Sequence, residues 1–151
     1  DTRVAKATCE ALTTLLGLRR EYPVLTRSQR PEGRPTSEGL ADVAWFDDAG
    51  GPLAESTWHD LGERVLQMVQ IPEPGNGHTM LLVVQGARDE RPVVLPGRPW
   101  SSGWTLLWDS AQVAAHTFDP AAAPEYGYEA ARARITVPPV CVRLYRGDTR
   151  R

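Results

Sequence analysis

Residues 65–85, with the sequence VLQMVQIPEPGNGHTMLLVVQ, carry the information that decides the fold. In an extended chain, side chains of residues 65–71 alternate between two faces, with Val65, Val69 and Ile71 together on one of them. Residues 79–85 form a continuous apolar run, which favours a central strand. Between them, residues 72–78 contain Pro-Glu-Pro-Gly-Asn-Gly, a strong turn signal. This stretch therefore predicts two strands joined by a turn.

The chain on either side of this stretch, after Gly39, also consists of short apolar segments separated by Pro and Gly. Further strands are predicted over residues 42–46, 93–95, 104–109, 134–137 and 140–145. Short strands at near-regular spacing are typical of an antiparallel β-sandwich. Residues 116–128 are rich in Ala and Pro and are expected to form a surface loop. The residues expected in the core are Leu81, Val83, Leu106, Trp108, Ile135, Val142 and Leu144.

The N-terminal segment has a different pattern, because residues 2–22 have the apolar spacing of an amphipathic helix. Its central apolar stripe consists of Val4, Ala11, Leu15, Leu18 and Tyr22, and Cys9, Leu12 and Leu16 widen it on one side. The apolar arc is roughly 180°, wider than one buried face requires. Pro23 ends the helix. We expect a helical segment over residues 1–27, a linker over residues 28–41 and a β-sandwich over residues 42–151.

Composition excludes several classes of function. The chain has a net charge of -2, so it lacks the basic field that a nucleic-acid-binding protein usually shows. Its apolar runs are too short to cross a membrane. Two cysteines, Cys9 and Cys141, do not make a disulfide framework. We interpret both as buried, reduced thiols of a cytoplasmic protein.

We find no assembled catalytic set in the sequence. The adjacent Asp47 and Asp48 precede Ala-Gly-Gly and are interpreted as turn residues, as is Asp109 at the end of a strand. The three histidines have no metal-ligand spacing, and His78, beside Asn-Gly, is expected in an exposed turn. The prediction is therefore no catalytic residue, no metal and no cofactor.

The tryptophans are the residues best suited to contact a sugar or another domain. Trp45, Trp104 and Trp108 lie within apolar strands and are expected to fill the core. With a period of two, Trp104, Leu106 and Trp108 would share one strand face. Trp58 and Trp100 lie in loop-like surroundings and are the candidates for an exposed contact.

Three stretches give the chain a resemblance to a known family. They are LTTLLGLRREYPVL at residues 12–25, DVAWFDDAGGPLAESTW at residues 42–58, and MLLVVQGARDERPVVLPG followed by WTLLWDSA within residues 80–111. In this order they resemble the C-terminal end of bacterial isoamylase-type glycogen debranching enzymes of the α-amylase superfamily. Gln85-Gly86 departs from that family's pattern, and residues 118–124 have no counterpart in it.

The resemblance implies that the parent enzyme hydrolyses α-1,6-glucosidic branch points in glycogen or limit dextrins with retention. The family's catalytic carboxylates lie upstream on a barrel, and no position here matches them. The chain would then be a non-catalytic fragment comprising the last barrel helix and the C-terminal sandwich. Its expected partners are that barrel, α-glucan through the parent, and a second copy through the exposed helix.

Two alternatives remain open from the sequence. The first is an independent carbohydrate-binding module that binds α-glucan through exposed tryptophans. The second is a complete small enzyme, which would need a polar cleft with convergent carboxylates or histidines.

Overall fold

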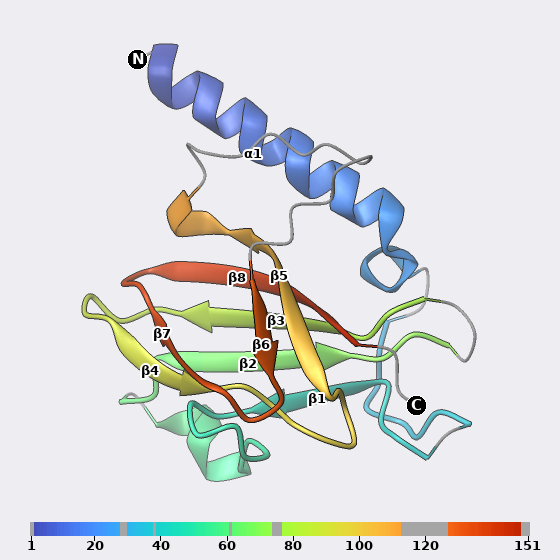
Figure 1. Cartoon of the computed structure of the whole chain (residues 1–151). Helices are drawn as coiled ribbons and strands as arrows, with labels where there is room; N and C mark the ends of the chain where they lie inside the picture. Colours follow the sequence, from blue (N-terminus) through green and yellow to red (C-terminus); the bar gives the residue numbers. More distant parts are fainter. Residues whose placement is uncertain are drawn as a thin grey trace.

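The protein folds as one N-terminal helix followed by antiparallel β-structure (Figure 1). The computed structural model describes residues 2–27, 30–37, 39–60, 62–73, 77–112 and 127–148. The helix α1 spans Thr2–Glu21, and short 3-10 helices follow at η1 Pro23–Thr26, η2 Glu55–His59 and η3 Ser110–Gln112. The strands are β1 Val43–Phe46, β2 Val65–Gln70, β3 Met80–Gln85, β4 Arg91–Val94, β5 Gly103–Asp109, β6 Tyr128–Ala130, β7 Arg134–Val137 and β8 Cys141–Gly147. The predicted fold class is confirmed.

The described strands form two sheets. The larger has the order β1-β2-β3-β8-β5-β6, and the smaller pairs β4 with β7. Every pair is antiparallel. The apolar run predicted as a central strand is β3, which lies between β2 and β8. The middle of the predicted turn between β2 and β3, residues 74–76, lies outside the described residues.

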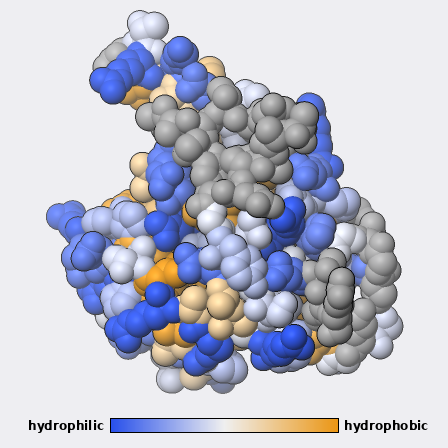
Figure 2. All heavy atoms as spheres, viewed as in Figure 1, coloured by the Kyte–Doolittle hydropathy of each residue, from blue (hydrophilic) through white to orange (hydrophobic). Residues whose placement is uncertain are grey.

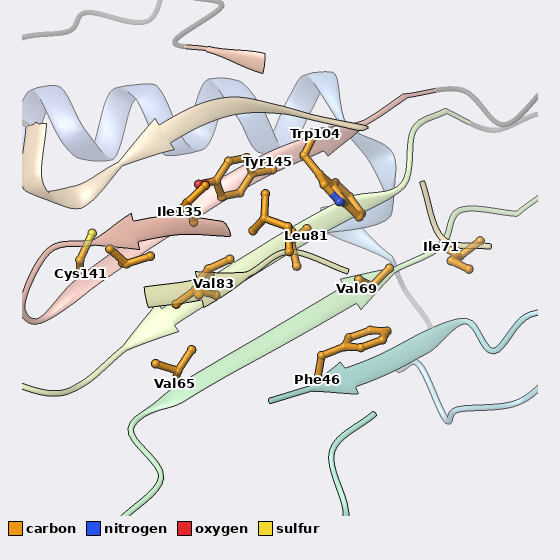
Figure 3. Packing of buried hydrophobic residues seen from close by; sticks show 13 residues of the cluster. Phe46, Val65, Val69, Ile71, Leu81, Val83, Trp104, Ile135, Cys141 and Tyr145 are labelled. Carbon is orange, nitrogen blue, oxygen red and sulfur yellow. The ribbon is translucent and has the colours of Figure 1, made fainter. Parts of the chain in front are cut away.

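The main core lies between the two sheets (Figure 3). Val69 of β2 and Leu81 and Val83 of β3 belong to the same buried cluster as Ile135 of β7. Residues on β2 are buried at alternate positions, as the period of two predicted. The buried members of this cluster are Phe46, Val65, Val69, Ile71, Leu81, Val83, Val93, Leu95, Trp104, Ile135, Val137, Cys141 and Tyr145.

A second, smaller core lies on the other face of the large sheet, beneath the C-terminal end of α1. Leu18 and Tyr22 pack there on Met80, Leu107 and Leu144. The helix extends past the sheet toward its N-terminus, and the space-filling view shows that end projecting from the body (Figures 1 and 2). Among the described residues, those of α1 that belong to this core or pack against it, Leu18 and Leu15, lie in its second half.

One predicted strand face is wrong, because β5 contains a β-bulge. Leu106 pairs with Tyr145 and Trp108 with Leu144, so Leu107 is an extra residue. A bulge reverses the alternation of side chains along the strand. Trp104 and Leu106 consequently contact the main core, whereas Leu107 and Trp108 contact the core beneath the helix.

Several expectations about single positions are also corrected. Leu81, Val83, Ile135 and Leu144 are buried as predicted, whereas Leu106, Trp108 and Val142 are only partly buried. Cys141 is buried but Cys9, on the N-terminal half of α1, is exposed. The predicted surface loop 116–128 lies outside the described residues up to 126, and Tyr128 begins a strand instead.

Candidate functional site

An aromatic pair lies on the outer face of the large sheet, away from the main core. Phe46 of β1 is buried in the main core, so the neighbouring Trp45 projects from the opposite face. The 3-10 helix η2 brings Trp58 beside it, with ring centroids 5.4 Å apart and an edge-to-face angle of 75°. Trp45 is half-buried, and Trp58 is 51% exposed. The exposed Trp58 ring is thus held against the half-buried Trp45 ring.

A hollow of about 390 Å³ opens beside Trp58, a volume within the range of small-ligand sites. Its apolar floor includes Leu66 and Val84, from the outer faces of β2 and β3. The remaining lining residues are Leu53, Thr57, Asp60, Glu63, Arg64, Val65 and Gly86. The hollow therefore combines an exposed ring, an apolar floor and charged side chains at its edge.

The two carboxylates at this hollow are each held by the local backbone. Asp60 Oδ1 accepts a hydrogen bond from the Gly62 N–H at 2.7 Å. Glu63 Oε1 accepts from the Arg64 and Val65 N–H groups at 2.9 and 2.8 Å. The second oxygen of each carboxylate has no bond to the described part of the chain and can accept one from a ligand.

The other tryptophans have structural positions. Trp100, expected to be exposed, is half-buried and packs edge-to-face on Phe46 at 5.6 Å. Trp104 is fully buried, and its Nε1–H donates to the Pro96 carbonyl at 2.7 Å. The core position expected for Trp45 is wrong, since it lies on the outer face. Of the two proposed contact residues, only Trp58 is thus open to solvent.

The carboxylates considered as catalytic candidates serve the fold. Asp47 Oδ1 accepts the Gly51 N–H at 2.8 Å and closes the predicted turn. Asp109 was interpreted as a turn residue, and its Oδ1 does accept the Ala111 N–H at 2.8 Å. Asp109 is also buried, and its Oδ2 pairs with Arg143 Nε at 2.8 Å, which no local sequence pattern indicates.

The same buried cluster contains one thiol. The Cys141 Sγ–H donates to Asp109 Oδ1 at 3.2 Å. Burial raises the pKa of the Cys141 thiol, and the hydrogen bond to Asp109 raises it further. A thiol held protonated in this way is a poor nucleophile. Both cysteines are free.

The histidines do not form a site in the described structure. His78 is not in an exposed turn, because its ring packs edge-to-face on Tyr22 at a centroid distance of 6.1 Å. His59 is exposed at the end of η2, and His116 lies outside the described residues. Among the described side chains, no group of three His, Cys, Asp or Glu could hold a metal ion.

A second candidate surface is the exposed apolar side of α1. Its large residues are Val4, Leu12 and Leu16, which are 64%, 56% and 44% exposed. Leu18, two residues beyond Leu16, is 2% exposed. The wide apolar arc expected from the sequence is therefore buried along one part of the helix only.

Comparison with known proteins gives little guidance. No family model matches the chain, and no curated protein matches it. A search of solved structures finds a Paenibacillus polymyxa xyloglucanase from glycoside hydrolase family 44, at 15% identity and a TM-score of 0.34. The match covers 56% of this chain and 17% of the xyloglucanase chain. None of the described helices has the length and hydropathy needed to cross a membrane.

Proposed function

We propose that the chain is the non-catalytic C-terminal part of an isoamylase-type glycogen debranching enzyme. In this proposal, residues 1–27 contribute the last helix of the catalytic barrel, residues 28–41 are a linker, and residues 42–151 are the C-terminal β-domain. The parent enzyme would hydrolyse α-1,6-glucosidic branch points, with its catalytic carboxylates on the barrel.

The observation that carries this proposal is the half-packed helix. A helix of a self-contained domain buries its apolar face against that domain. Here Leu18 and Tyr22 pack on the sheet, whereas Val4, Leu12 and Leu16 remain exposed. An apolar surface of this kind is usually covered by another domain or subunit. A preceding barrel would cover the N-terminal half of the helix while the sheet covers the rest.

The test uses two proteins: the 151-residue chain, and the same chain joined to the sequence that precedes it in its gene. The chain alone should release no reducing ends from branched α-glucan, because in this proposal the catalytic carboxylates lie on the barrel and not in this chain. The longer protein should release linear chains. Turnover by the chain alone, lost on Asp60→Asn or Glu63→Gln, would refute the proposal.

Direct α-glucan binding is a second candidate function, favoured by the pair of Trp45 and Trp58. An exposed indole beside carboxylate oxygens that have no partner among the described residues suits a sugar, whose ring C–H face is apolar and whose hydroxyls donate hydrogen bonds. The apolar floor at Leu66 and Val84 would lie beneath the next ring of an oligosaccharide.

Tryptophan fluorescence during titration with maltoheptaose tests this second function. Trp58→Ala should abolish the saturable change while the thermal midpoint stays within a few degrees, because Trp58 is half exposed. Tyr128→Ala removes another exposed aromatic ring from a different edge of the sheet and is the matched control. Binding at Trp58 would be excluded if both variants lost the saturable fluorescence change equally. It would also be excluded if the unsubstituted chain showed no saturable change.

A further inference from the structure

A hollow of about 360 Å³ lies where η1, the segment 30–36 and the end of β2 meet. Three arginines are among the residues that line it: Arg27, Arg30 and the largely exposed Arg34. Asp42 and Glu73 supply two carboxylates at the hollow, and Glu32 Oε2 pairs with Arg34 Nε at 2.7 Å, so the charges of these six side chains balance. The other lining residues are Pro23, Val24, Pro35, Thr36, Ile71 and Pro72.

The carboxylate nearest Arg27 is already occupied. Asp42 Oδ1 accepts the Gly33 N–H at 2.8 Å, and Oδ2 accepts the Glu32 N–H at 3.2 Å. Asp42 thereby fixes the backbone of the segment that carries Arg34. Its approach to Arg27 Nη1 is only 4.0 Å, at the limit of an ion pair. Asp42 therefore orders this segment more than it satisfies the guanidinium.

Two polar atoms in the lining are buried and have no protein partner in the described structure. They are Arg27 Nη2 and Thr36 Oγ1. A buried polar atom of a folded protein nearly always has a partner, since leaving it unpaired costs free energy. A cationic donor and a hydroxyl left open around one hollow are complementary to a ligand that supplies oxygen acceptors and negative charge.

We propose that Arg27, Arg30 and Thr36 form a binding site for a small ligand that carries a phosphate group. A planar carboxylate is satisfied by the fork of one guanidinium, whereas a tetrahedral phosphate has oxygens for several donors around it. The hollow is large enough to hold a phosphate with an attached small molecule. This site lies apart from Trp58 and is independent of the debranching proposal.

The experiment is an NMR titration of the 151-residue chain with inorganic phosphate, at ionic strength held constant with sodium chloride. The Arg27 and Arg30 Nε–Hε signals should shift and saturate. Arg27→Gln should raise the half-saturating phosphate concentration at least about tenfold, the effect of losing one charged hydrogen bond. Thr36→Val should raise it by a smaller factor. Arg88→Gln, which removes an exposed arginine elsewhere, should leave it unchanged.

A parallel titration with acetate separates the ligand classes. Saturation by phosphate but not by acetate supports the proposal. Equal saturation by acetate would overturn the phosphate assignment. A linear change that never saturates, or one that Arg88→Gln weakens as much as Arg27→Gln, would show that the hollow holds only water. If Arg27→Gln fails to fold, the Arg27 signal of the unsubstituted chain and the Thr36→Val variant decide the result.

Discussion

Asp109 connects three strands through one buried carboxylate. Its side chain is 3% exposed and that of Arg143 is 14% exposed, so water contributes little to either charge. The pair also orients the Cys141 thiol, and Arg143 Nη1 donates to the Thr136 carbonyl at 3.2 Å. Arg143 thereby links β8 to β7 as well as to β5.

Removing this carboxylate should be costly. Asp109→Ala leaves the Arg143 guanidinium and the Cys141 thiol without their shared acceptor. We expect a loss of about 3 kcal/mol in the free energy of unfolding, because breaking a buried ion pair strands the remaining charge. Urea denaturation measures this loss. Asp48→Ala removes an exposed carboxylate from a turn and should change stability by less than about 0.5 kcal/mol. Equal losses in the free energy of unfolding for Asp109→Ala and Asp48→Ala would contradict a stabilising role of the Asp109–Arg143 pair.

Tyr145 predicts how stability responds to alkaline pH. Burial raises its pKa to about 12, although Arg143 acts in the opposite direction. Tyrosines of the unfolded chain ionise near pH 10. Between about pH 10 and 12 the unfolded chain has lost a proton that the folded chain keeps, so the free energy of unfolding falls as pH rises.

Tyr145→Phe should therefore flatten this decrease, measured by urea unfolding from pH 9 to 11.5. The slope should not vanish, because burial also raises the pKa of Tyr22. A slope that is unchanged in Tyr145→Phe would show that Tyr145 keeps an ordinary pKa in the folded chain.

Among the elements, the strands show how far the sequence predicts structure. The alternation with a period of two predicts β2, and the continuous apolar run predicts β3. Both segments are long enough for a pattern to be recognised. The bulge at Leu107 has no mark in the sequence Thr-Leu-Leu-Trp, since an inserted apolar residue looks like any other. The three-residue β6 was missed because so short a segment forms a strand only by pairing with β5.

The candidate sites could likewise be predicted only where they depend on local sequence and not on strand pairing. Exposure of Trp58 was expected from its polar surroundings, whereas its contact with Trp45 depends on which face of β1 points to the core. The buried pairing of Asp109 joins residues 34 positions apart and depends on strand register. The hollow lined by Arg27 and Arg30 is formed largely by segments without regular secondary structure, so no repeating sequence pattern predicts it.

The turn between β7 and β8 contains a strained residue. Val140 has a φ of 46° and is 71% exposed. A β-branched residue in the left-handed region is unfavourable by roughly 1–2 kcal/mol, and Asn tolerates this conformation. Val140→Asn should raise the free energy of unfolding by about 1 kcal/mol, visible as a higher thermal midpoint. Val140→Ala keeps a Cβ without the tolerance of Asn and should gain less. A lower midpoint for Val140→Asn would contradict the strain.

At the scale of the whole molecule, the exposed side of α1 predicts self-association. A leucine left in water forgoes roughly 1.5–3 kcal/mol of burial free energy. Two copies of the isolated chain can recover this by packing helix against helix across a two-fold axis. We expect sedimentation at high micromolar concentration to show a dimer, and the double variant Leu12→Glu, Leu16→Glu to be a folded monomer.

Leu18→Glu is the matched control for this prediction. Leu18 is buried on the sheet, so this variant should lose stability rather than change only its association. If the unsubstituted chain sediments as a monomer, the helix does not mediate association, and the contact is absent from the isolated chain.

The pairing of β3 with β8 joins residues 80–85 to residues 141–147 across the middle of the large sheet. During synthesis, β1, β2 and β3 leave the ribosome long before β8 exists. The nascent chain then carries an apolar strand with one open edge, which invites pairing with other chains. β5 can form its long ladder only after β8 has been made, and the bulge at Leu107 belongs to that pairing. The large sheet can therefore close only after β8 has been made, and until then the open edge of β3 is exposed to chaperones and to other chains.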